Sequence, residues 1–315
     1  MLSSVVHRIG LGLLTLLVVS ALVFIGTEIL PGDAATAILG KAATPQAVAA
    51  LRHALGLNEP APLRYWHWLV SVLHGNLGTS LANDRPVAEL IATRLKNTLF
   101  LAGVSASMAV PLAIILGILS AINQNGVFDR IISIFSIGAI SVPDFFIAYM
   151  LILVCAVQFD WFPSLATVSS AQDLPARLHA IALPSITLTL VVLAHMMRMT
   201  RASIIGVMSQ PFVEMAFLKG LPRWRIVVQH ALPNAVAPII NVVAINLGFL
   251  IVGVVVVEVV FVYPGIGQLM VDAVSSRDVP IVQACGLLFG AIYVGLNMVA
   301  DLLATMLNPI LRAPK

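Results

Sequence analysis

The sequence predicts an all-α integral membrane protein with six transmembrane helices. Sixty per cent of its 315 residues are hydrophobic and only 10% are charged, whereas a soluble globular domain carries roughly 25% charged residues. A helix needs roughly 20 apolar residues, at 1.5 Å each, to cross a hydrocarbon core of about 30 Å. Six stretches meet this requirement: residues 9–30, 98–122, 131–158, 180–204, 235–261 and 281–307.

The positions of lysine and arginine predict that both chain ends are cytoplasmic. Short cytoplasmic loops are enriched in these residues, and long loops are exempt from the rule. With the N-terminus inside, nine of the seventeen fall in cytoplasmic segments and two in short outer loops. The nine are Arg8, Arg130, Arg198, Arg201, Lys219, Arg223, Arg225, Arg312 and Lys315; the two are Arg177 and Arg277. The net charge of +3 therefore reflects lysines and arginines that are retained on one side of the membrane. No nucleic-acid partner is expected.

The chain divides into three segments by this topology. Residues 1–30 form the N-terminal segment and a retained first helix, because no small-residue cleavage site follows the apolar run. Residues 31–97 form an outer segment with amphipathic helices, one starting at Thr44 and Pro45 and one over 62–74, whose Tyr65, Trp66 and Trp68 favour the membrane interface. Residues 98–315 form a five-helix core.

A polar interruption at residues 212–233 predicts two short helices around a tight turn. Lys219 falls in the last turn of the first helix, and Gly220 follows where a left-handed conformation costs glycine little. Pro222 suits the start of the second helix, which we expect to close at Leu232 and Pro233. Each helix has apolar residues at helical spacing that we expect to enter a groove on a partner: Val213, Ala216 and Phe217, and then Trp224, Val227 and Val228.

Two carboxylates inside the apolar spans are candidates for a pathway or subunit contact, because intramembrane charge is costly. Asp144 lies about 20 Å along the third span, directly after Pro143, where we expect a kink. A shallower position of Asp144, with the span shifted, is the alternative. Glu258 is close to its helix end, so an interfacial carboxylate that reaches water is the favoured interpretation.

Catalytic and cofactor motifs are not found in the sequence. No G-x-x-x-x-G-K-[ST] loop, G-x-S-x-G elbow or H-E-x-x-H pair occurs, and Cys155 and Cys285 have no metal-binding or redox spacing. We therefore expect neither an enzyme nor a chain that itself binds ATP, another cofactor or a metal.

The polar interruption resembles the E-A-A, three residues, G, then L-P loop of bacterial ABC-importer permeases. Glu214, Ala216, Gly220, Leu232 and Pro233 have its spacing, although Met215 replaces one alanine and Phe217 stands where peptide permeases often carry arginine. Further landmarks resemble the dipeptide, oligopeptide and nickel branch of these permeases: residues 30–33 (LPGD), 75–80 (GNLGTS), 85–90 (RPVAEL), 258–261 (EVVF) and 264–267 (PGIG).

The resemblance implies a type I ABC-importer permease fold in the bacterial inner membrane, forming half of a translocation pathway. Residues 205–234 would be the coupling loop that docks on a cytoplasmic ATPase. The site residues that it implies are Glu214, Ala216, Phe217, Gly220, Arg223, Trp224, Leu232 and Pro233. The implied partners are a second homologous permease, two ATPase subunits that use ATP and Mg²⁺, a periplasmic or lipid-anchored substrate-binding protein, and membrane lipid.

The cargo stays open among dipeptides, oligopeptides, glutathione and nickel chelates, because specificity in such importers lies largely in the binding protein. The alternative function is a secondary transporter or channel that works without ATPases. That class requires paired ionisable groups at the membrane midplane and symmetry-related repeats. The lone Asp144 supports it poorly.

Overall fold

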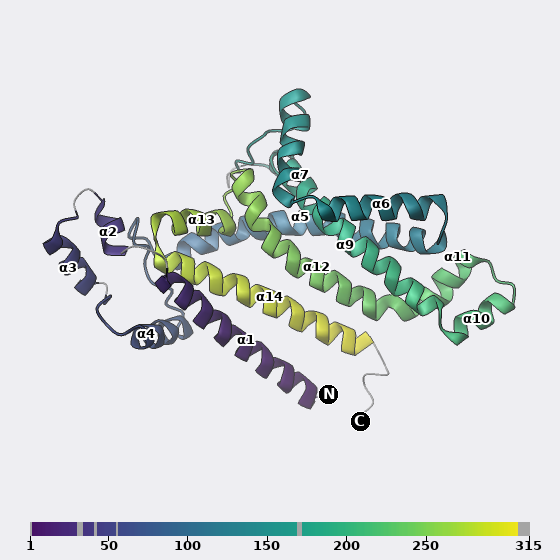
Figure 1. The fold of residues 1–315 in the computed structure, drawn as a ribbon, viewed down its shortest axis with the longest axis horizontal. Helices are drawn as coiled ribbons and strands as arrows, with labels where there is room; N and C mark the ends of the chain where they lie inside the picture. Colours follow the sequence, from purple (N-terminus) through teal and green to yellow (C-terminus); the bar gives the residue numbers. More distant parts are fainter. Residues whose placement is uncertain (1, 30–33, 41–42, 55, 169–171, 308–315) are drawn as a thin grey trace. The chain divides into compact units, whose positions relative to one another are not determined.

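The structure is a computed structural model that describes residues 2–29, 34–40, 43–54, 56–168 and 172–307. Every regular element within these residues is a helix, apart from one isolated bridge between Thr79 and Pro86. The predicted all-α class is therefore confirmed. The chain forms two compact units (Figure 1): the first consists mainly of Phe100–Tyr263, and the second of Ile9–Leu99 and Pro264–Val294.

Among the described residues, five helices are long and apolar enough to cross a membrane, and a bent helix pair makes a sixth if it forms one crossing. The five are α1 (Leu2–Ile29), α5 (Val87–Ile122), α9 (Ala182–Met208), α12 (Leu232–Val260) and α14 (Val279–Leu307). The pair consists of α6 (Val127–Ser141) and α7 (Asp144–Leu151), with a π-helical extension over Ile152–Gln158. The six predicted spans agree with this count when the pair is one crossing.

The bend between α6 and α7 is 102° and lies at Pro143. Proline has no N–H to continue a helix and pushes the preceding residue into an extended conformation; Val142 has φ −96° and ψ 129°. The predicted kink is confirmed. The predicted span over 131–158 consists of two helices, because the chain turns at Pro143 and a new helix begins at Asp144.

In the first unit, α9 and α12 run side by side and form the core (Figure 1). Leu188 and Met196 of α9 and Leu250 and Val254 of α12 are almost completely buried there. Both α6 and α7 also pack on α9. The short α8 (Leu174–Ala180) precedes α9 and is capped by the carboxylate of Asp173.

In the second unit, α1 and α14 approach closely at two glycines. A Cβ atom on Gly290 would lie 2.8 Å from Cγ1 of Val19, and one on Gly286 would lie 3.0 Å from Cγ2 of Val23. The same unit contains α2 (Ala34–Leu39), α3 (Pro45–Ala54), α4 (Ala61–Leu73) and α13 (Ile266–Ser276).

The two amphipathic helices predicted in the outer segment are α3 and α4. The N–H of Ala47 donates to Oγ1 of Thr44, which caps α3 as expected. In α4, Tyr65 and Trp68 pack against Phe24 of α1, with ring centroids 5.4 and 6.2 Å away. These two aromatic rings therefore anchor α4 on α1, and α4 exposes Trp66 instead.

Several landmarks that lie far apart in the sequence meet in the second unit. The side-chain amide of Asn97 donates to the carbonyl of Pro264 over 2.9 Å. The N–H of Ile266 donates to Oγ1 of Thr98, also over 2.9 Å. The buried hydroxyl of Ser80 donates to the buried carboxylate of Asp278. The 75–80 and 264–267 motifs thus each make a polar contact with a distant segment of the second unit, Ser80 with Asp278 and the 264–267 turn with α5.

Candidate functional site

Two short helices, α10 (Pro211–Leu218) and α11 (Arg223–Ile226), form a helix-turn-helix that we call the hairpin. The predicted turn is confirmed: Gly220 has φ +76°, and its N–H donates to the carbonyl of Phe217 over 2.9 Å. Pro222 precedes α11 in an extended conformation. A Cβ on Gly220 would meet no atom within 4 Å, so the glycine is required by the backbone conformation and not by lack of space.

The inner face of the hairpin is a small hydrophobic core. Val213 and Ala216 of α10 and Ile226 of α11 are buried against each other, with Val207, Met208 and Leu221 around them. The prediction that Val213 and Ala216 face a partner is therefore wrong, because their side chains hold the two helices of the hairpin together. Val227 is also fully buried, in a neighbouring cluster with Ala231 and Ile204.

The hairpin and the segment directly after it expose several large apolar side chains, which we together call the docking face. Its large apolar side chains are Phe212, Met215, Phe217, Leu218, Trp224 and Val228. Phe217, Trp224 and Val228 were predicted on such a face, whereas Phe212, Met215 and Leu218 were not. Glu214, Lys219 and Arg225 are exposed beside them.

The hairpin continues without a break into α12. The N–H of Leu232 donates to the carbonyl of Val227, five residues back, in the π-helical segment Val227–Ala231. Pro233 cannot donate a hydrogen bond, and a π-helical turn directly before it changes the bonding pattern without ending the helix. The prediction that Leu232 and Pro233 close a short helix is therefore wrong: one apolar helical stretch runs over Arg223–Val260.

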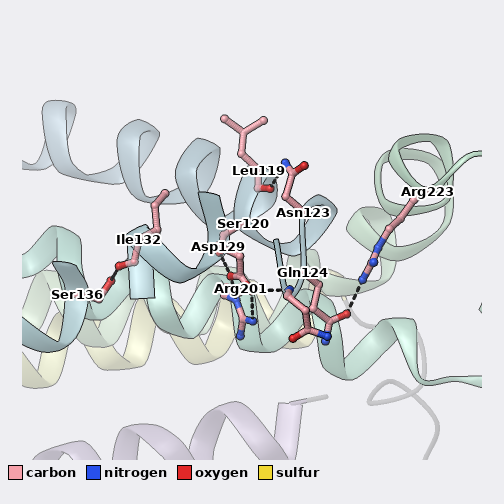
Figure 2. Close-up of polar contacts among 10 residues, drawn as sticks. Leu119, Ser120, Asn123, Gln124, Asp129, Ile132, Ser136, Arg201 and Arg223 are labelled. Atoms are coloured by element: carbon pink, nitrogen blue, oxygen red, sulfur yellow. Dashed lines mark hydrogen bonds and ion pairs between the residues drawn. The ribbon is translucent and has the colours of Figure 1, made fainter. Parts of the chain in front are cut away.

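A buried ion pair lies in the same unit as the hairpin (Figure 2). Arg201 of α9 binds the carboxylate of Asp129 in α6 through two bonds: Nε to Oδ1 over 2.6 Å and Nη2 to Oδ2 over 2.8 Å. The hydroxyl of Ser120 and the N–H of Asn125 also donate to this carboxylate. Sequence reasoning missed the pair, because its members are 72 residues apart and Arg201 was treated only as a topology marker.

A second contact in Figure 2 connects the hairpin to the turn between α5 and α6. The guanidinium of Arg223 donates to Oε1 of Gln124. Gln124 immediately precedes Asn125, whose N–H binds Asp129. Polar contacts therefore link the hairpin, the α5–α6 turn and α9.

Asp144 lines a cavity of about 370 Å³ in the first unit, together with His195 of α9 and Asn246 of α12. The carboxylate is half-buried, at the first residue of α7. The count of about 20 Å along the span crosses the 102° bend just before Asp144, so the depth of this carboxylate in the membrane stays a prediction.

Glu258 is fully buried in the first unit. Its carbonyl accepts the N–H of Tyr263 over 2.8 Å where α12 ends. The expectation of an interfacial carboxylate that reaches water is wrong for this residue, and its side chain offers no surface to a second subunit in this structure.

Neither cysteine forms a disulfide in the structure: Cys285 is buried and Cys155 half-buried. In the part of the chain that the structure describes, no three His, Cys, Asp or Glu side chains are grouped to hold a metal ion. The arrangement therefore offers an apolar docking face with a polar anchor, and a cavity with one carboxylate.

Comparison with known proteins gives matches along nearly the whole chain. Residues 113–313 match the family described as "Binding-protein-dependent transport system inner membrane component", and residues 1–102 match the N-terminal component of such systems. A probable peptide ABC transporter permease protein of Sinorhizobium fredii is 38% identical over 309 residues, covering 98% of each chain. The glutathione transport system permease proteins GsiC of Pectobacterium atrosepticum and Escherichia coli O6:H1 are 38% and 39% identical over 313 residues, covering 99% of each chain.

Proposed function

Because the chain belongs to the family of inner membrane components of binding-protein-dependent transport systems, we propose that it imports peptides or peptide-like solutes. It is a multi-pass permease subunit of an ABC importer in the inner membrane, and it has no ATPase site of its own. The peptide and glutathione cargo named for its relatives supports the proposed substrate class. This membership sets aside the secondary transporter, since family members work with a binding protein.

The proposed assembly has four kinds of subunit. This chain pairs with a second homologous permease, and the two together enclose the pathway. Two cytoplasmic ATPase subunits bind ATP and Mg²⁺, and each binds the hairpin of one permease. A periplasmic or lipid-anchored binding protein delivers cargo to the outer face.

The observation that carries the coupling role is the docking face. Monomeric proteins rarely expose a large contiguous apolar patch unless another surface covers it. Val213, Ala216 and Ile226 already fill the inner core of the hairpin, so its outward apolar side chains are free to meet a partner. Leu218 is 76% exposed, at the end of α10 where the chain turns.

The anchoring contacts support transmission of motion from the hairpin into the membrane. The hairpin is continuous with α12, so a displacement of α11 moves the helix that forms the core with α9. The bond from Arg223 to Gln124 connects the same helix to the α5–α6 turn. We propose that ATP-driven movement of the ATPases reaches the pathway through these two connections.

A charge placed on the docking face tests this role. Leu218→Glu should weaken retention of the ATPases by roughly tenfold or more, because fully burying a leucine contributes about 1.5–3 kcal/mol. The measurement is ATPase stoichiometry in the purified complex, together with peptide uptake into proteoliposomes. Leu73→Glu in α4 is the matched control, since Leu73 is 77% exposed and lies outside the hairpin. Full ATPase retention by Leu218→Glu would refute the docking assignment.

A further inference from the structure

The cavity beside Asp144 lies deep along the two core helices of the first unit. His195 is midway along α9, thirteen residues from either end, and Asn246 is midway along α12, fourteen from either end. At 1.5 Å per residue each lies about 20 Å from both helix ends. Polar side chains at such a depth face cavities or partners and mark transport pathways.

The lining of the cavity combines three polar side chains with an apolar wall. The polar groups are Asp144, His195 and Asn246, and the wall includes Leu188, Phe249 and Leu250. The side-chain N–H₂ of Asn246 donates to the carbonyl of Val242 over 2.8 Å, so its oxygen remains an acceptor. The volume of about 370 Å³ falls within the range of small-molecule sites, about 300–1,000 Å³.

Among the described residues, no ion pair balances the charge of Asp144. The ion pairs found among the described residues use other carboxylates, such as those of Glu28, Glu59, Glu89 and Asp129. A carboxylate that lines the same cavity as His195 and Asn246 favours a cationic ligand over leaving its charge unmatched. Phe249 is an exposed aromatic residue on the same wall, and the face of an aromatic ring also attracts cations.

The chemistry favours an ammonium group over a metal ion. Only two lining residues, Asp144 and His195, are common metal ligands, and no group of three occurs in the described chain. One carboxylate, one amide oxygen and one aromatic face suit a primary ammonium, which is a compact donor of three hydrogen bonds.

We propose that this cavity binds the N-terminal ammonium group of a peptide during its passage, with Asp144 as the counter-charge and the apolar wall receiving the first side chain. The statement that the physiological ligand is a peptide rests on the proposed function. The charge preference is a property of the cavity and can be measured without transport.

The first measurement uses a thiol inside the cavity. Val256 lines it and is exposed, so Val256→Cys is introduced into the full complex in lipid nanodiscs, with Cys155 and Cys285 replaced by alanine. The rates of reaction with a trimethylammonium and a sulfonate thiosulfonate reagent are compared. Asp144→Asn should lower the cation-to-anion rate ratio about tenfold, as expected for one nearby charge in a medium less polar than water.

Asp160→Asn is the matched control, since it removes an exposed carboxylate of the same unit that does not line the cavity. Asp160 has φ +50°, a conformation that asparagine tolerates. The control should leave the rate ratio unchanged. An unchanged ratio in the Asp144→Asn complex would overturn the proposal, whatever the effect of hairpin variants on ATPase retention or uptake.

The second measurement identifies the ligand group. Alanyl-alanine should slow the labelling of the thiol introduced by Val256→Cys, whereas N-acetyl-alanyl-alanine, which lacks the ammonium, should not. Gly253→Leu retains the charge of Asp144 but fills the cavity, because a Cβ at Gly253 would lie 3.7 Å from Oδ2 of Asp144. In this variant alanyl-alanine should no longer slow the labelling, while the thiol should still react faster with the cationic reagent. Equal protection by both peptides, or none at saturating concentration, would overturn ammonium recognition.

Discussion

Two small residues determine the shape of the hairpin, one in its turn and one in its inner core. Gly220 permits the left-handed turn between α10 and α11, and Ala216 lets the two helices approach in the inner core. A bulky substitution at Ala216 would overpack this core at a cost of about 1–3 kcal/mol. Loss of coupling in such a variant would therefore report a distorted hairpin and not a lost ATPase contact.

Substitutions at Gly220 should depend on backbone preference and not on side-chain volume. Gly220→Val should destabilise the turn by about 1–2 kcal/mol or more, since a β-branched residue is unfavourable at positive φ. Gly220→Asn should be tolerated, because asparagine visits this region and the site has free space. ATPase retention and uptake of the purified complexes measure the effect. Equal losses in the valine and asparagine variants would contradict this explanation.

At the scale of helices, the Asp129–Arg201 pair fixes α6 on α9. The carboxylate accepts four hydrogen bonds, from Arg201, Ser120 and Asn125. Such a pair is costly to break, because removing one partner leaves a buried charge unmatched. It also contributes to one contact network with the hairpin, through the α5–α6 turn.

Breaking this ion pair should destabilise the first unit more than removing it entirely. Asp129→Leu or Arg201→Met alone should cost about 3–5 kcal/mol, whereas the double variant should recover part of the loss. The measurement is the thermal unfolding midpoint of the detergent-solubilised permease, followed by tryptophan fluorescence. Arg198→Met, at an exposed position one turn earlier on α9, is the control. A double variant less stable than either single variant would contradict the model of one isolated pair.

The helices show which features sequence patterns could predict. Spans, the Pro143 kink and the Gly220 turn follow from local chemistry, and the structure has all three. The buried face of α10 was missed because every residue of α10 except Glu214 is apolar: spacing alone fits a buried Val213 and Ala216 as well as a buried Phe212 and Met215. The Asp129–Arg201 pair and the Asp144 cavity depend on tertiary packing, which no spacing encodes.

At the scale of the whole molecule, the first unit contains the hairpin, the buried ion pair and the Asp144 cavity. The second unit contains α1 from Ile9 onward, the outer-segment helices and the polar contacts of Ser80 and Thr98. We propose that the membrane adds a further division: residues 31–97 outside, the hairpin region 205–234 in the cytoplasm, and both chain ends inside.

This orientation decides whether the docking face can reach an ATPase at all, and thiol labelling tests it. The nine-to-two bias of lysine and arginine in short loops predicts that the hairpin lies on the cytoplasmic side. In a background with Cys155 and Cys285 replaced by alanine, Thr79→Cys should react with an impermeant maleimide added outside intact cells, and Lys219→Cys should not. Both positions are exposed. Lys219 is chosen in preference to Arg223 because the Arg223 side chain binds Gln124 and would be lost on substitution. After permeabilisation both thiols should react, which shows that each is accessible. The reverse pattern would put the docking face outside the cell, where there is no ATP-hydrolysing partner, and the coupling role would fail with it.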